Sequence, residues 1–286
     1  MADNQCSGCP SASSCTTQQK ENCSSKQGPQ SMMEPMNKYS NIKKVIGIVS
    51  GKGGVGKSFV TASLAAAMKK TGAQVGIMDA DITGPSIPKM FGAAGEVYGN
   101  AEGMILPAET KDGLKLISIS FLMEDPQDPV IWRGPVIGGA VKQFWTDVVW
   151  GDLDYLLIDM PPGTGDVPLT VFQSIPVDGI IIVTSPQELV QMIVKKAYRM
   201  ASGMHIPVLG VVENFSYLEC PDCGRKIRLF GESHLDQAAD ELGIQVLGKI
   251  PLDPQMAQAA DDGTFFEKDH AYLDKAAETL KNLEKK

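Results

Sequence analysis

The residues from Gly51 to Ser58 have the types and the spacing of a loop that binds phosphate. Their order fits the pattern G-x-x-x-x-G-K-[ST], with Gly51, Lys52, Gly53, Gly54, Val55, Gly56, Lys57 and Ser58. Glycines let successive backbone N–H groups turn toward one anion, and the N-terminus of a following helix adds partial positive charge. In such a loop Lys57 contacts the β- and γ-phosphates and Ser58 coordinates Mg²⁺. The pattern therefore predicts a nucleoside triphosphate as ligand.

Aspartates at the ends of two predicted strands are the expected partners of this loop. Asp79 and Asp81 follow one apolar run, and Asp159 ends another. We expect Asp159 to hold Mg²⁺ directly or through water, Asp79 to belong to the magnesium shell, and Asp81 to position the attacking water. Gly163 is expected to offer its amide to the γ-phosphate, which would make its loop a switch. The alternative is that the aspartates only cap strand ends.

Asn214 ends a further predicted strand, in the sequence VVENFS. Its amide is a candidate for reading the edge of adenine, and a turn-forming asparagine is the alternative. The chain downstream of the loop contains no Asn-Lys-x-Asp signature of guanine recognition, which favours ATP over GTP.

Two cysteines, Cys220 and Cys223, stand in the sequence CPDCG between a predicted strand and a helix. Two thiolates are half of a tetrahedral site that suits Zn²⁺ or an iron–sulfur cluster. Three completions are open. Two subunits could each give one pair across a two-fold axis, Cys6 and Cys9 could give the second pair, or the pair could be a redox dithiol. The spacing alone does not separate zinc from iron–sulfur.

The other four cysteines lie near the N-terminus, at Cys6, Cys9, Cys15 and Cys23. Residues 1–40 contain almost no bulky apolar side chains and cannot form a core of their own, so we expect a disordered Cys-rich tail ahead of an ATPase domain at 41–286. Four cysteines in this short stretch would suffice for one cluster, and incidental thiols are the alternative.

Composition limits the classes of partner and location. The 286 residues carry a net charge of −8, which argues against a broad nucleic-acid surface. No apolar run approaches the length of a membrane span, and the N-terminus lacks the apolar region of a signal peptide. We therefore expect a cytoplasmic protein, with no membrane partner, whose cysteines are metal ligands or free thiols.

Short apolar runs alternate with helical stretches from about residue 41 to 270. Both features predict a doubly wound α/β fold with a mostly parallel sheet and ligands at the carboxyl ends of the strands. The expected strands are 45–50, 75–79, 114–119, 155–159, 179–184, 208–214 and 246–250, and the expected helices include 58–70, 187–204, 233–242 and 270–286.

Six motifs, taken together and in order, resemble one family. They are GKGGVGKS, MDADITGPSIP, WRGP, DMPPGTGD, VENFS and CPDCG. The chain is similar to the Mrp-type iron–sulfur cluster carriers, MinD-like P-loop ATPases that also include the eukaryotic cytosolic cluster scaffolds. The resemblance covers about residues 40 to 265.

The resemblance implies a homodimer in which Cys220 and Cys223 of both subunits hold one bridging [4Fe–4S] cluster. It implies ATP binding coupled to loading the cluster from donors or delivering it to apoprotein clients. Lys52 matches the additional lysine of the MinD, ParA and nitrogenase iron-protein loop, which reaches the partner subunit's nucleotide and stabilises charge during phosphoryl transfer.

The tail matches the cytosolic scaffolds only in part. Cys6, Cys9 and Cys15 fit their C-x₂-C-x₅-C portion. Those proteins place the remaining cysteine upstream, whereas Cys23 of this chain lies downstream.

Other functions remain as alternatives at this point. One is a redox ATPase like the nitrogenase iron protein, although that protein takes its cluster cysteines from two distant segments. Another is a positioning ATPase of the MinD or ParA type, which needs a membrane- or DNA-binding surface. Delivery of a metal other than iron is a third.

Overall fold

The computed structural model describes residues 32–81, 86–93, 97–100, 102–122, 134–163, 165–186 and 190–284. The chain divides into a unit Met1–Met33 and a unit Glu34–Lys286, and the architecture below is that of the second unit. The four N-terminal cysteines lie outside the described residues. Residues 34–40, which the sequence assigned to the tail, belong to the second unit. The Glu34 N–H donates to the Ser174 carbonyl at 2.8 Å, and Asn37 Nδ2 donates to the Val148 carbonyl at 2.8 Å.

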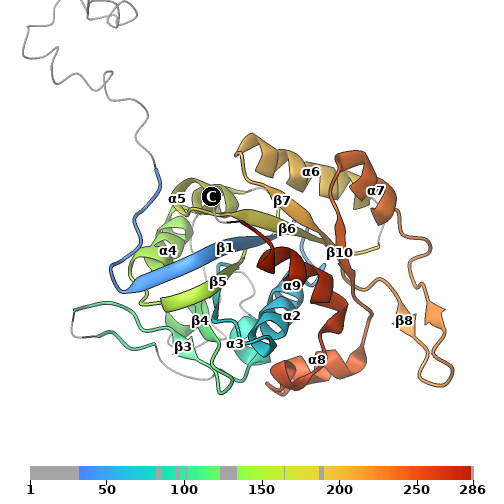
Figure 1. The fold of residues 1–286 in the computed structure, drawn as a ribbon, viewed down its shortest axis with the longest axis horizontal. Coiled ribbons are helices and arrows are strands. Elements are labelled where there is room, and N and C mark those ends of the chain that lie inside the picture. Colours follow the sequence, from blue (N-terminus) through green and yellow to red (C-terminus); the bar gives the residue numbers. More distant parts are fainter. Residues whose placement is uncertain are drawn as a thin grey trace, which may run out of the picture. The chain divides into compact units, whose positions relative to one another are not determined.

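A twisted sheet runs through this unit (Figure 1). In the described residues it has eight strands in the order β10-β7-β6-β1-β5-β2-β4-β3, and every neighbouring pair is parallel except β3 with β4. The strands are β1 (Ser40–Ser50), β2 (Val75–Asp79), β3 (Ala108–Glu109), β4 (Lys115–Ser118), β5 (Gly151–Asp159), β6 (Gly179–Thr184), β7 (Val208–Glu213) and β10 (Val246–Lys249).

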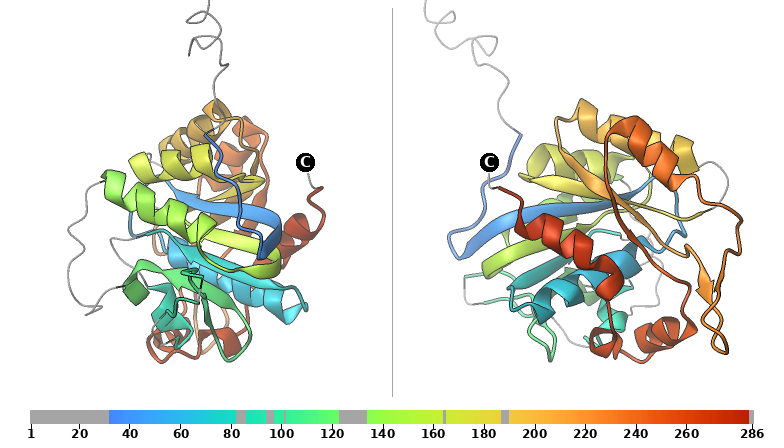
Figure 2. Two further views of the ribbon diagram at one scale, coloured as in Figure 1. Left: turned by 90° about the vertical axis from the view of Figure 1, so that its left-hand side faces the viewer. Right: turned by 45° about the vertical axis from the view of Figure 1, so that its right-hand side comes forward.

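Helices cover both faces of this sheet (Figures 1 and 2). The α-helices are α2 (Lys57–Lys70), α3 (Ile87–Met90), α4 (Gly134–Thr146), α5 (Asp166–Ser174), α6 (Val190–Gly203), α7 (Leu235–Leu242), α8 (Pro254–Asp261) and α9 (Asp274–Lys281). Short 3₁₀ turns are η2 (Ile119–Leu122), η3 (Phe265–Glu267) and η4 (Ala271–Leu273).

Alternating side chains of the central strands supply two separate cores. In β1, Val45 and Val49 pack with α4, α5, α6 and α7, whereas Ile46 and Ile48 pack with α2, α3, α8 and α9. A strand buried on both faces needs a continuous apolar run, and the sequence of β1 has one. The predicted doubly wound, mostly parallel α/β fold is confirmed.

The C-terminal helix is shorter than predicted. The sequence favoured one helix over 270–286, but α9 covers only Asp274–Lys281 and follows the turn η4. His270 lies outside the helix because its Nε2 bonds to the Phe265 carbonyl at 3.1 Å. The apolar stripe of the prediction is nevertheless buried at Ala276, Ala277 and Leu280.

Two features at the carboxyl edge of the sheet position the candidate sites. The register pairs Ile48 of β1 with Asp159 of β5, and Asp159 in turn with Asp79 of β2, so these aspartates converge beside the phosphate loop. After β7 the chain leaves the sheet and forms a hairpin of β8 (Leu218–Glu219) and β9 (Lys226–Ile227) before it returns to α7. The hairpin projects from the body of the fold (Figure 1).

Every helix in the described part of the chain is too short or too polar to cross a lipid bilayer.

Candidate functional site

The phosphate loop joins β1 to α2, as predicted. Gly54 and Gly56 both have φ near +77°, in the left-handed region that glycine enters at little cost. Gly56 also has no room for a side chain, since an added Cβ would stand 2.1 Å from Asn214 Nδ2. Helix α2 begins at Lys57 and contains no acidic residue in its first turn, so its positive end stays open to an anion.

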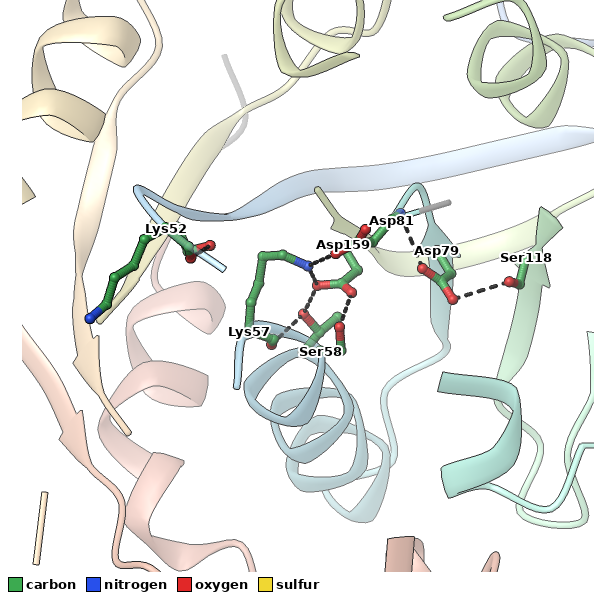
Figure 3. Close-up of polar contacts among 9 residues, drawn as sticks. Lys52, Lys57, Ser58, Asp79, Asp81, Ser118 and Asp159 are labelled. Carbon is green, nitrogen blue, oxygen red and sulfur yellow. Dashed lines mark hydrogen bonds and ion pairs between the residues drawn. The ribbon is translucent and has the colours of Figure 1, made fainter. Parts of the chain in front are cut away.

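Lys57 is held by carboxylates in this structure (Figure 3). Its Nζ lies 2.8 Å from Asp159 Oδ1 and 3.3 Å from Asp81 Oδ2. Asp159 is fully buried and also accepts hydrogen bonds from Ser58 Oγ at 2.5 Å and from Thr61 Oγ1 at 2.8 Å. The oxygens of Ser58 and Asp159 are thus adjacent, and oxygen donors of this kind suit Mg²⁺.

Asp79 is directed away from this group and toward β4 (Figure 3). Its Oδ2 accepts a hydrogen bond from Ser118 Oγ at 3.1 Å, and its Oδ1 accepts one from the Asp81 N–H at 3.2 Å. Burial first, and then the neighbouring Asp159 carboxylate, raise the pKa of Asp79 well above its usual range. In this geometry Asp79 fixes the backbone that presents Asp81.

Two residues with expected roles at the γ-phosphate are placed differently from the others. The Lys52 side chain extends away from Lys57 and the three aspartates (Figure 3). The Gly163 N–H donates to the Ser50 carbonyl at 2.8 Å, and Gly163 has a φ of +87°. This amide must therefore exchange its present partner before it can bind a phosphate.

Asn214 lies beside the phosphate loop, and the nitrogen of its side-chain amide is hydrogen-bonded to that loop. Its Nδ2 donates to the Val55 carbonyl at 3.1 Å, whereas its buried Oδ1 has no hydrogen-bond partner within the described residues. The buried hydroxyls of Thr184 and Ser185, at the end of the adjacent strand β6, also have none there. Unsatisfied buried polar atoms are rare in native proteins, so these three are candidates for contact with a bound water, ion or ligand.

A cavity of about 240 Å³ opens over the loop. Its lining includes Gly54, Lys57, Ser58, Asp81 and Pro162. The loop from Gly53 to Ser58 and Asp81 thus face one space at the carboxyl edge of the sheet. The other residues predicted for the nucleotide do not line this cavity, namely Gly51, Lys52, Asp79, Asp159, Gly163 and Asn214.

The two described cysteines occupy the turn of the β8–β9 hairpin. The Cys220 N–H donates to the Arg225 carbonyl at 3.0 Å, and the Gly224 N–H donates to the Cys220 carbonyl at 2.9 Å. The backbone N–H groups of Asp222 and Cys223, followed by the Cys223 thiol, lower the pKa of Cys220. Such donors favour the thiolate, the form that binds metal.

Cys223 is exposed and Cys220 is half-buried. Within the described part of the chain, no third Cys, His, Asp or Glu completes a group with this pair. That the pair is half of a shared site stays a prediction from the spacing of the two cysteines.

Several residues with structural importance were missed from the sequence. Thr61 and Ser118 touch the aspartates, and Glu213 is a fully buried carboxylate next to Asn214. Phe215 has a φ of +59°, which is strained for an aromatic residue. The sequence signal that could have identified Glu213 is an acidic residue placed directly after the apolar residues Val211 and Val212, at the end of a strand that is otherwise apolar.

Comparison with known proteins gives consistent matches over most of the chain. A family described as ParA, NUBPL iron-transfer P-loop NTPase, matches residues 41–286. An iron–sulfur cluster carrier protein of Methanocaldococcus jannaschii is 49% identical over 262 residues, which cover 91% of this chain and 88% of that protein.

Solved structures agree with these matches. A nucleotide-binding protein of Archaeoglobus fulgidus in complex with ADP is 45% identical with a TM-score of 0.71, over 79% of this chain and 88% of that one. The cell-division ATPase MinD of Pyrococcus furiosus, at 21% identity and a TM-score of 0.56 over 85% of this chain and 100% of that one, shares the fold.

Proposed function

The chain belongs to the family of NUBPL iron-transfer P-loop NTPases, and from that membership we propose that it is an ATP-dependent iron–sulfur cluster carrier. It binds and hydrolyses ATP at the phosphate loop and couples this to loading a [4Fe–4S] cluster or transferring it to apoproteins. The observation that carries the proposal is the presence, in one chain, of a phosphate loop and a hairpin with two cysteines. The hairpin follows strand β7, and Asn214, directly after β7, contacts the phosphate loop. The similarity to cluster carriers supports the identity of the cargo.

The nucleotide site assigns a role to each polar side chain. Lys57 exchanges its carboxylate partners for the β- and γ-phosphates. Ser58 and Asp159 hold Mg²⁺, which neutralises charge on the phosphates when bound. Asp81, which is less buried than Asp159, orients the attacking water. Gly163 leaves the Ser50 carbonyl for the γ-phosphate, so its loop reports whether that phosphate is present.

Asn214 supports adenine as the base. One Nδ2 hydrogen is already given to the Val55 carbonyl, and the buried Oδ1 has no partner within the described residues, so Oδ1 is the acceptor that Asn214 offers a ligand beside its second Nδ2 hydrogen. The exocyclic amine of adenine donates a hydrogen bond, whereas the corresponding oxygen of guanine only accepts. Against Oδ1, the guanine oxygen would place two acceptors together in a buried site, which is unfavourable, whereas the adenine amine would donate.

The cysteine hairpin supports a cluster shared between two chains. Cys220 and Cys223 give two thiolates, and a [4Fe–4S] cluster needs four. A homodimer with the hairpins facing across a two-fold axis supplies the second pair. This arrangement leaves the cluster at the surface of each subunit, where a client can accept it. A cytoplasmic location belongs to the proposal, since reducing conditions keep the thiols free.

Iron loading tests the proposal directly. After anaerobic reconstitution, protein shortened to residues 34–286 should hold about four iron and four sulfide per dimer, with the visible absorption of a cluster. Cys220→Ala and Cys223→Ala should each lose this iron and weaken the dimer, because one remaining thiolate per chain leaves only two for the cluster. Asp222→Asn, within the same turn, is the matched control. Stoichiometric zinc with no uptake of iron would contradict the proposal.

A further inference from the structure

A buried carboxylate closes the base of the segment that carries the cysteines. We call residues 216–233 the cysteine segment. Glu213, at the end of β7, is fully buried, and its Oε2 accepts a hydrogen bond from Ser216 Oγ at 2.6 Å. Its Oε1 accepts one from Ser233 Oγ. The two serines stand where the chain enters and leaves the cysteine segment, so one side chain holds both ends.

The residues that follow Glu213 bind the phosphate loop. Asn214 donates to the Val55 carbonyl, and the Phe215 ring lies against Gly56, where an added Cβ would stand 3.3 Å from the ring. Phe215 lies there with its backbone in the left-handed region, with φ at +59°, which is strained for an aromatic residue. Residues 213–215 therefore contact the nucleotide loop on one side and the cysteine segment on the other.

Near its entrance the cysteine segment is also held by two backbone hydrogen bonds, from the Ser216 N–H to the Ile250 carbonyl at 2.8 Å and from the Leu252 N–H to the Tyr217 carbonyl at 2.7 Å. The part beyond this base has few buried contacts. Residues 221–232 are all exposed. A cavity of about 310 Å³ separates the hairpin from α7 and β10, with Lys226 and Arg228 on one wall and Asp236 and Lys249 on the other. A segment with few buried contacts takes its orientation from its base.

We propose that Glu213 is a positioning residue that transmits the state of the phosphate loop to the cysteine pair through its paired bonds to Ser216 and Ser233. The inference rests on the proposed function and adds to it the connection between the two sites. A nucleotide that moves Val55 or Gly56 moves Asn214 and Phe215, and the Glu213 carboxylate carries that displacement to both ends of the cysteine segment together. Coupling of this kind is reciprocal, so a bound cluster also changes the affinity for nucleotide.

The chemistry of the carboxylate explains why a glutamate serves here. A charged acceptor makes stronger hydrogen bonds than a neutral one, and its two oxygens serve two hydroxyls at once. Glu213→Ala removes both bonds. Glu213→Gln keeps one acceptor oxygen in the same shape, so it should retain part of the coupling. Ser233→Ala releases only the exit of the segment.

The test uses the reactivity of the two thiols in the full-length protein without a cluster. The alkylation rates of Cys220 and Cys223 are measured by peptide mass spectrometry, with and without Mg²⁺ and a non-hydrolysable ATP analogue. We expect the analogue to change these rates by about fivefold in the unmodified protein, a usual size for coupling between two sites. The response should vanish in Glu213→Ala, be partial in Glu213→Gln and Ser233→Ala, and persist in Glu232→Gln, an exposed glutamate next to the segment's exit.

Affinity for the analogue separates positioning from a structural defect. It should stay within about twofold in every variant without a cluster, since Glu213 does not face the phosphate cavity. If Glu213→Ala does not fold, Ser233→Ala carries the test. A full response in Glu213→Ala or Ser233→Ala, or no response in the unmodified protein, overturns the inference. Iron loading is measured separately. A protein that loads iron but lacks the thiol response would contradict only the coupling through Glu213 and not the proposed carrier function.

Discussion

The phosphate loop and the cysteine hairpin occupy the same edge of the fold but are built in opposite ways. Around Lys57 and Asp159 the polar groups are buried, and each is paired within the chain. Around Cys220 and Cys223 the side chains are largely exposed, and the ligand set is incomplete within the described residues. Buried, paired groups are held in a fixed geometry, whereas an exposed pair of thiols is open to ligands and partners from solvent. This difference suits a cluster carrier, because such a protein must bind its nucleotide tightly and release its cargo to another protein.

The largest effect should come from breaking the buried site. Lys57→Ala should lower ATP hydrolysis by about 100-fold or more, because it removes a charge that stabilises the transferring phosphoryl group. It also removes the cation that balances the buried Asp159 carboxylate, so the unfolding free energy without nucleotide should fall by about 3 kcal/mol. Steady-state hydrolysis and denaturant melts measure both. Lys69→Ala, on the outer turn of the same helix, is the control. Unchanged hydrolysis in Lys57→Ala would show that the loop is not the active site.

The next largest effect concerns Lys52 and tests whether the nucleotide site also needs a residue from a second chain. Lys52→Ala should lower turnover by about 100-fold while nucleotide affinity changes little, because its side chain extends away from its own Lys57. Mixing Lys52→Ala with Lys57→Ala should then recover about a quarter of normal activity. Half of the randomly formed dimers contain both variants, and each has one intact composite site. No recovery in the mixture, or normal turnover in Lys52→Ala alone, contradicts the role in trans.

A smaller effect concerns the N-terminal cysteines and leaves both regions unchanged. Deleting residues 1–33 should remove about four iron per chain from a reconstituted protein, without altering hydrolysis or iron at the hairpin. The deletion stops before Glu34 because Glu34 and Asn37 bond to the ATPase unit. Cys23→Ala in the full chain tests whether the downstream cysteine is the fourth ligand. Equal iron in full-length and shortened proteins would mean that the tail holds no cluster.

The smallest effect concerns a buried histidine that lies outside both the phosphate loop and the cysteine hairpin, and it tests the stability of the fold alone. Burial, and then the charge of Lys70, lower the pKa of His270 to about 4. Between pH 6.5 and 4 this histidine is protonated in the unfolded chain but neutral in the folded one. The unfolding free energy therefore decreases by about 2–3 kcal/mol as the pH is lowered through this window. His270→Gln should flatten that slope in pH-dependent denaturation, and the exposed His205→Gln should leave it unchanged. The same slope in both variants would assign the acid sensitivity elsewhere.

Much of the fold follows from local sequence pattern. Strands β2 and β6 cover the residues predicted for them, and the phosphate loop joins the expected strand and helix. Short apolar runs define strands well when both faces of a sheet are covered. Asp159 contacts Lys57 because the adjacent parallel strands β5 and β1 end at the same edge of the sheet. The sequence also predicts this contact, since both motifs follow apolar strands.

The remaining features depend on contacts that no local pattern encodes. Thr61 reads as an ordinary helix residue until β5 brings Asp159 beside it, and Ser118 becomes a partner of Asp79 only because β4 pairs with β2. The bond from Glu213 to Ser233 closes across 20 residues of chain. Asp79 itself was expected in the magnesium shell, and its orientation toward Ser118 could be known only from the strand order.

The cysteine segment is an excursion whose ends meet at one carboxylate, and this has a consequence for how such proteins diversify. Once the ends of a loop are tied together, doubling its length costs only about 0.6 kcal/mol in closure entropy. Strand β7, helix α7 and strand β10 all lie outside the interval between Ser216 and Ser233. Insertions, shorter turns or a different set of ligands can therefore be exchanged in that interval while the nucleotide engine stays folded. The segment is therefore a suitable position for introducing a different set of ligands into this ATPase fold.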